Sequence, residues 1–219
     1  MLNFEAEKPF VKNSGYRIGK LSSKYETSGR GPGTVSSGKD DEGGVSYGSY
    51  QLASRKGSVA KFLAGEGAKW ADEFKGLDPT VPGGEFTRKW KAIAARSPME
   101  FGDAQHQFIQ RTHYEPVIAA VKKRTGLELS EHSNAVKDVV WSTAVQHGGA
   151  QHIIAAGARS VSLKTSDPKF DHALINAIYE SRSNYVAGLK KMSPVRKSRE
   201  IARYKKERID ALNALNGDS

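Results

Sequence analysis

The sequence has no cysteine among its 219 residues, which excludes a disulfide framework, thiol catalysis and a cysteine-ligated zinc site. Proline is also scarce, with eight residues, whereas glycine is common at 22. No apolar run approaches the ~18 residues that a membrane-spanning helix requires. The first ten residues carry two acids and no apolar segment typical of a secretory signal, so we expect synthesis in the cytoplasm without a signal peptide.

Length and composition indicate an ordinary folded chain. Hydrophobic residues make up 37% and charged residues 26%, which is neither a disordered nor a fibrous composition. We expect one domain over residues 1–219, with enough apolar residues for a sizeable core, and we expect a monomer.

Positive charge is concentrated near the C-terminal end. The formal net charge is +10, and residues 188–208 contain nine basic side chains against two acidic ones. The predicted basic helical segment, residues 188–215, therefore favours a polyanionic partner such as an anionic bacterial envelope. A solvated helix face that only keeps the protein soluble is the alternative.

The apolar periodicity predicts helices over most of the chain. Stripes at helical spacing occur in residues 17–26, 85–96, 97–126, 134–147, 167–185 and 199–215. Residues 29–48 contain seven glycines, which rules out a persistent helix there, and Val45 and Tyr47 alternate as in a short strand. The predicted class is mainly α, in an α+β arrangement: a helical lobe with a small N-terminal β-hairpin or loop insertion beside a cleft.

Two groups of acids flank the glycine-rich segment. Glu26 ends the first predicted helix beside Tyr25, and partial burial there would raise the pKa of its carboxyl, as a general acid requires. The loop acids Asp40, Asp41 and Glu42 could supply a second, ionised carboxylate, as glycoside cleavage uses. A plain acidic turn and a solvated glutamate are the alternatives. Six histidines show no metal-ligand spacing, so neither a metal nor another cofactor is expected.

Two further stretches support a resemblance to a known family. Glu26-Thr27 followed by GVSYGSYQ at 44–51 resembles the lysozyme-like superfamily, above all goose-type lysozymes and soluble lytic transglycosylases. VVWSTAVQHGG at 139–149 resembles the central core helix of chitosanase-like and phage-type lysozymes. Phage endolysins, virion-associated lysins and secreted peptidoglycan hydrolases share this layout.

The resemblance implies roles for individual residues. It makes Glu26 the general acid and places Asp41 or Glu42 as the second acid. It also places Gln51 in the turn that lines the cleft, with Ser49 and Tyr50 where the family has Leu-Met. Tyr47 and Tyr50 are candidates to stack on sugar rings, and Gln146 and His147, at the end of the core helix, are candidates for substrate contacts. A helix cap is the alternative role for His147.

The function implied is a bacteriolytic, peptidoglycan-cleaving glycosidase, either a muramidase-type hydrolase or a lytic transglycosylase. Its partner would be peptidoglycan glycan strands, at the cell wall or in the periplasm, after delivery by a holin, a virion or a secretion system. Two alternatives stay open. One is a chitosanase or chitinase, against which the positive charge argues. The other is a non-catalytic basic module for nucleic acid or membranes, although no nucleic-acid motif is present and nucleic acid is not the expected partner.

Overall fold

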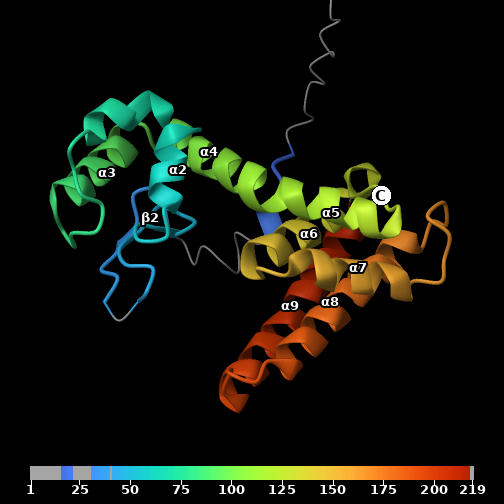
Figure 1. The fold of residues 1–219 in the computed structure, drawn as a ribbon. Coiled ribbons are helices and arrows are strands. Elements are labelled where there is room, and N and C mark those ends of the chain that lie inside the picture. Colours follow the sequence, from blue (N-terminus) through green and yellow to red (C-terminus); the bar gives the residue numbers. More distant parts are fainter. Residues whose placement is uncertain (1–15, 22–30, 40, 218–219) are drawn as a thin grey trace, which may run out of the picture.

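The chain is mainly helical, with one small antiparallel sheet (Figure 1). The computed structural model describes residues 16–21, 31–39 and 41–217. The sheet contains β1 (Val35–Ser36), β2 (Ser46–Tyr47) and β3 (Leu52–Ala53). The helices are α2 (Ser58–Ala64), η1 (Ala68–Phe74), α3 (Glu85–Arg96), α4 (Pro98–Ile109), η2 (Gln110–Tyr114), α5 (Glu115–Thr125), η3 (Leu129–Glu131), α6 (Asn134–Gln146), α7 (Ala150–Ser160), α8 (Phe170–Gly188) and α9 (Pro194–Gly217). The expected fold class is confirmed. None of the described helices is long and apolar enough to cross a membrane.

The helices and the sheet form two lobes (Figure 1). The smaller lobe contains the sheet, α2, η1 and α3, and the larger contains α5 to α9. The α4 helix runs from one lobe to the other, and α8 and α9 form an antiparallel hairpin that projects from the larger lobe. We call this projection the α8–α9 hairpin.

The sheet is short but has a defined register. Its order is β1-β2-β3, with Val35 opposite Tyr47 and Ser46 opposite Ala53. The strand expected at Val45 and Tyr47 is therefore confirmed as β2. Its side chains are buried on both faces, which anchors the glycine-rich segment to the small lobe.

Most helix boundaries agree with the sequence pattern. The α3 helix covers the whole of the expected 85–96, and α6 ends just before Gly148. The disturbance expected at Pro116 is a π-helical turn, η2, because proline lacks the N–H that a regular ladder needs. The α9 helix begins at Pro194, five residues before the predicted start at 199. Of the helix expected at 17–26, Lys20 and Leu21 are helical, and residues 22–26 lie outside the described residues.

Buried aromatic rings hold each lobe together. In the small lobe, Trp90 is fully buried and contacts the rings of Tyr47, Phe62 and Phe101 at centroid distances of 4.7–5.6 Å. Where the lobes join, Trp141 of α6 is also fully buried. Offset and edge-on ring pairs of this kind each add about 0.5–1.5 kcal/mol beyond their buried area.

Gly48 provides a test of how tightly the glycine-rich turn packs. Its φ is +79°, and an added Cβ would lie 2.2 Å from Oε1 of Gln105, whose side chain is fully buried. We expect Gly48→Ala to lower the free energy of unfolding by about 3 kcal/mol, from left-handed strain plus overpacking. Gly76 has a φ of +78° and no atom within 4 Å of an added Cβ, so Gly76→Ala should cost only about 1 kcal/mol. Urea unfolding of both variants checks this, and equal losses would contradict it.

Candidate functional site

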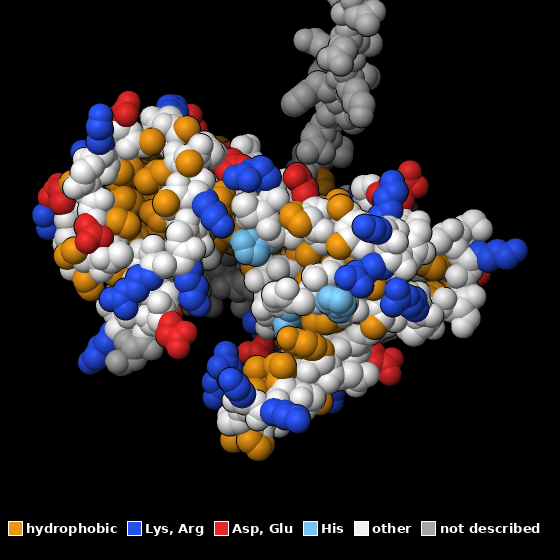
Figure 2. All heavy atoms as spheres, in the orientation of Figure 1, with side chains coloured by type: hydrophobic (Ala, Val, Ile, Leu, Met, Phe, Trp, Pro, Cys, Tyr) orange, Lys and Arg blue, Asp and Glu red, His pale blue; other side chains and the backbone are white. Residues whose placement is uncertain are grey.

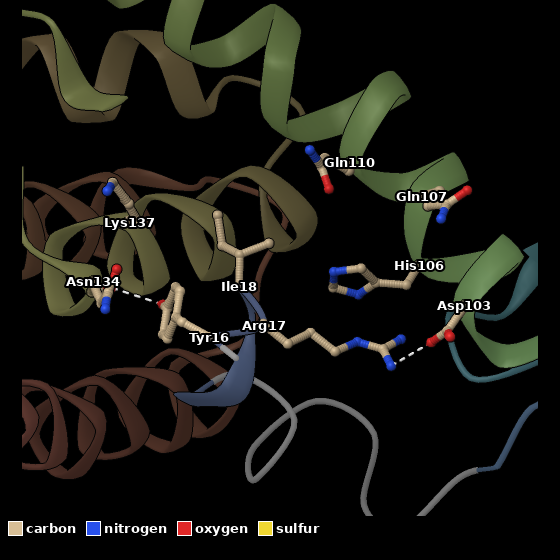
Figure 3. Close-up of a pocket in the computed structure, with 9 residues that line it drawn as sticks. All are labelled: Tyr16, Arg17, Ile18, Asp103, His106, Gln107, Gln110, Asn134 and Lys137. Carbon is tan, nitrogen blue, oxygen red and sulfur yellow. Dashed lines mark hydrogen bonds and ion pairs between the residues drawn. The ribbon is translucent and has the colours of Figure 1, made fainter. Parts of the chain in front are cut away.

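A cleft lies where residues 16–20 and the loops of the small lobe face α4 and α6. Two adjoining hollows of about 490 and 630 Å³ form it. Both are lined by the same five residues, Tyr16, Arg17, Ile18, Asp103 and His106. Figure 3 shows the first hollow, with residues 16–18 between α6 and α4. Because the two hollows adjoin and share polar and titratable side chains, we take this cleft as the candidate site.

One wall of the cleft is fixed by a buried carboxylate on α6. Oδ1 of Asp138 accepts a hydrogen bond from the Gly19 N–H at 2.6 Å, and Oδ2 accepts one from the Leu21 N–H at 3.1 Å. Both N–H groups lie at the start of a helical turn, where a carboxylate is a favourable acceptor. Burial raises the pKa of Asp138, and the backbone hydrogen bonds oppose that rise. Asp138 therefore holds residues 16–21 against the core helix.

An ion pair joins the two walls across the cleft. Nη1 of Arg17 lies 2.5 Å from Oδ1 of Asp103 on α4, with both side chains about half exposed. Figure 3 shows the Arg17 side chain extended toward α4 to reach it. Exposed pairs contribute little to stability, about 0.2–1 kcal/mol, so this bridge can open without loss of the fold.

The floor of the cleft is a stack of rings. His106 of α4 lies parallel to Trp141, with centroids 4.5 Å apart, and its Nδ1 is 2.7 Å from the Tyr50 hydroxyl. Burial, assisted by the nearby Arg17 charge and opposed by Asp103, lowers the pKa of His106 to about 4. The imidazole is therefore neutral at pH 7. It contributes a neutral hydrogen-bonding group to the cleft, and no positive charge.

The rest of the lining of the first hollow is polar and uncharged, apart from one lysine. Gln107, Gln110 and Asn134 present side-chain amides, and Lys137 contributes an ammonium group. Each amide both donates and accepts hydrogen bonds, so the cleft is suited to a polar ligand. No group of metal-ligating side chains occurs among the residues that the structure describes.

Two of the residues predicted as substrate contacts line this cleft, and one is buried in the core. Ser49 and Tyr50 are part of the second hollow. Tyr47 is fully buried, and its hydroxyl donates to the Pro79 carbonyl at 2.8 Å, so its ring packs in the core and offers no stacking surface. Gln51 has a φ of +53°, and its side-chain amide donates to the Gly48 carbonyl at 3.0 Å, which shapes the turn next to the cleft.

The predicted acids are not assembled at the cleft by any described contact. Glu26 and Asp40 lie outside the described residues. Asp41 is exposed and accepts the Gly43 N–H at 2.8 Å, which fits the alternative of an acidic turn. Glu42 is exposed as well, and neither of these two acids lines either hollow.

Gln146 and His147 belong to a second polar cluster, away from the cleft, which we call the α6–α9 network. Oε1 of Gln146 accepts from Arg182 at 2.5 Å, and Nε2 of His147 is 3.0 Å from the Tyr204 hydroxyl. Arg182 and Glu207 are fully buried and 3.5 Å apart. Burial lowers the pKa of His147 to about 4, assisted by the charge of Arg182. These side chains join α6, α8 and α9, and they are not open to a ligand in the described cleft.

Sequence reasoning missed the residues that shape the cleft. Asp138 is the one acid of the α6 sequence and lies among the valines Val136, Val139 and Val140, which is the signal that could have identified it. Arg17, Asp103 and His106 carried no local signal, because their relation depends on segments 86 residues apart in sequence.

The fold and the cleft define a mainly α, two-lobed protein with a polar groove, and comparison with known proteins then gives the family. Residues 18–208 match the family described as type VI secretion system spike protein VgrG3-like, C-terminal, and the chain belongs to this family. The chain is 38% identical over 182 residues to the type VI secretion system spike protein VgrG3 of Vibrio cholerae serotype O1. That match covers 80% of this chain and 17% of the relative, so the chain corresponds to a small part of the relative's length.

These findings correct the family and function inferred from the sequence. The family match and the curated relative point to a VgrG3-like C-terminal domain, where the sequence had suggested the lysozyme-like superfamily. They point to a secretion spike and not to a peptidoglycan-cleaving glycosidase, so the predictions of an enzyme, of a phage lysin and of glycan strands as the partner are overturned. The chitosanase and the nucleic-acid or membrane module do not fit either. Delivery by a secretion system, one of three expected routes, agrees with the family.

The two buried histidines predict how stability depends on pH. Their pKa values in the folded state, about 4, lie below the ordinary value of 6.5, so the unfolded chain binds more protons between pH 6.5 and 4. The free energy of unfolding should therefore fall as the pH is lowered through that window. His106→Gln should reduce the slope of the unfolding free energy against pH by up to the contribution of one bound proton. The matched variant His172→Gln, at an exposed position, should leave that slope unchanged. Urea unfolding from pH 7 to 4 measures this, and parallel curves for all three proteins would refute it.

The buried ion pair gives a second prediction. Removing the Glu207 carboxylate leaves the Arg182 guanidinium buried without its counter-charge, so Glu207→Ala should cost about 3–5 kcal/mol of unfolding free energy. Glu180→Ala, on the exposed face of α8, should cost under about 0.5 kcal/mol. The double variant Arg182→Met/Glu207→Leu should recover part of the loss, because the fully buried Arg182 charge is removed together with its partner. A loss below about 1 kcal/mol for Glu207→Ala would contradict this interpretation.

Proposed function

We propose that this chain is a domain exported by a type VI secretion system together with its spike, and that it acts as a terminal part of, or a passenger on, that spike. The observation that carries the proposal is the family match over residues 18–208, joined to a relative that is itself named a type VI spike protein. The chain spans about a sixth of that relative, so the export activity of the whole spike is part of the proposal.

The architecture supports a domain that travels as a folded unit. Its buried apolar residues form one cluster that runs from Leu21 to Ala211 and includes both lobes. A core of this extent does not need a neighbouring chain to cover it. The expected site of action, the cell wall or periplasm of the recipient bacterium, stays part of the proposal, and so does the expected single domain over residues 1–219.

The cleft gives the exported domain a place to hold a polar ligand. Ser49 and Tyr50 line it from the small lobe and Asp103 from α4, and the buried His106–Trp141 stack forms its floor. We propose Ser49 and Tyr50 as ligand contacts there. The amide side chains of the first hollow favour a polar ligand, and they assign no reaction.

Export can be tested in the bacterium that encodes the chain. An epitope-tagged chain is expressed in a strain with a working secretion sheath and in an otherwise identical strain whose sheath gene is deleted. We expect the tagged chain in the medium of the first strain only, with a cytoplasmic marker retained in both. Fractionation of recipient cells should then place the delivered chain in the periplasm. Equal amounts in the two media would sink the proposal, and delivery into the recipient cytoplasm alone would remove the periplasmic part.

A further inference from the structure

The α8–α9 hairpin differs from the rest of the surface in how its charges are arranged. On the body of the protein, several basic side chains are paired with acids, among them Lys69 with Glu100, Arg88 with Glu85, Arg96 with Glu73 and Arg111 with Glu66. On the hairpin, the exposed cations make no ion pair with any residue that the structure describes. They are Lys190, Lys191, Arg196, Arg199, Lys205 and Lys206.

The acids within the same stretch are already engaged. Glu207 is fully buried against Arg182, and Glu200 accepts a hydrogen bond from Gln146 at 2.9 Å. Neither can neutralise the outer surface. Figure 2 shows Lys and Arg side chains around the projecting end of the hairpin, with apolar side chains between them. The surface therefore carries a concentrated excess of positive charge.

One face of α9 also carries a regular, unpartnered stripe. Val195, Arg199, Ala202, Lys206 and Ile209 are separated by four, three, four and three residues, so they lie along one side of the helix. All five are exposed, with Val195 at 72% and Ile209 at 57%. The opposite side of α9 is buried through Tyr204 and Ala211. Large apolar side chains at both ends of an exposed stripe are typical of a helix that packs against another protein.

The hairpin is held rigidly enough to act as a preformed surface. The Arg196 N–H donates to the Ser193 hydroxyl at 3.3 Å at the start of α9, and Nζ of Lys197 donates to the Ala187 carbonyl at 2.8 Å across the turn. Leu189 and Met192 pack against the core from the turn. Binding a partner here would therefore cost little conformational entropy, because the hairpin is already ordered.

We propose that the outer face of α9, from Val195 to Ile209, docks an acidic, amphipathic helical surface of the secretion spike. Charge complementarity defines the partner: carboxylates opposite Arg199, Lys205 and Lys206, and apolar side chains against Val195 and Ile209. The two exposed apolar residues are 14 positions apart, about 21 Å along the helix, with cations between them. On a bilayer surface, this face would have to bury its apolar side chains and its cations at the same depth. A nucleic acid would contact the cations but would leave Val195 and Ile209 without apolar contacts. A protein helix matches both.

The inference rests on the proposed function for the identity of the partner. Its test uses the whole chain and the purified spike of the bacterium that encodes it, with affinity measured by biolayer interferometry. The test variant reverses four charges, Arg196→Glu, Arg199→Glu, Lys205→Glu and Lys206→Glu. The matched control reverses four exposed lysines on the body, Lys61→Glu, Lys91→Glu, Lys123→Glu and Lys164→Glu, so both variants have the same net charge.

We expect the hairpin variant to bind at least 100-fold more weakly than the natural chain, and the body variant to bind within about 3-fold of it. Val195→Ser/Ile209→Ser should weaken binding about 10-fold, which a purely electrostatic contact would not show. Circular dichroism and urea unfolding confirm that each variant is folded. Equal affinity of the hairpin and body variants overturns the inference.

Two further probes separate the other possible occupants of this face. Vesicles of phosphatidylglycerol and a DNA duplex are tested on the same variants. Hairpin-dependent binding to either of them, with none to the spike, also overturns the inference. If the natural chain is exported and the hairpin variant still binds the spike normally, only the docking surface is wrong. If the natural chain is not exported, the proposed function itself falls.

Discussion

The burial of α6 at the junction of the two lobes is the constraint on which the rest of the structure depends. Trp141 supports the His106 ring from one side of the helix, and Asp138 holds the N–H groups of Gly19 and Leu21 from another. An added Cβ at Gly19 would lie 2.8 Å from the Trp141 indole nitrogen, so the N-terminal wall approaches the helix as closely as sterics allow. The position of the cleft follows from these two side chains of a single helix.

The two polar systems of the molecule have different physical roles. The α6–α9 network is dry: Arg182 and Glu207 are fully buried, and their mutual attraction offsets a large desolvation cost only while both are present. The cleft is open, and the ion pair across it, Arg17 with Asp103, is exposed and weak. The first system fixes how α8 and α9 join the core, and hence where the hairpin projects. In the cleft, the weak Arg17–Asp103 pair can open, so the side chains there can exchange hydrogen-bond partners.

Local patterns predicted the helices well because periodicity is a property of neighbouring residues. The stripe of Phe86, Trp90 and Ile93 gave the whole of α3, and Gly126, with a φ of +76°, ends α5 as expected. The same reasoning predicted that Tyr47 contacts substrate, but its ring is buried in the core. A tyrosine in a short strand between glycines has the same local sequence pattern whether its ring is exposed or buried. The family inference failed for a related reason: short glycine-rich and helical motifs are shared by many folds, and only the match over residues 18–208 distinguishes them.

The sequence by itself determined the helical class, the small strand at Ser46–Tyr47 and the excess of positive charge near the C-terminal end, since each is written in composition or short-range spacing. It could not decide which acids meet which bases. Arg17 and Asp103 are 86 residues apart, and Asp138 reaches a backbone 119 residues away, so only tertiary packing brings them together. Packing also decided that Glu207 is buried against Arg182 on the inner side of α9, away from the exposed Arg199, Lys205 and Lys206.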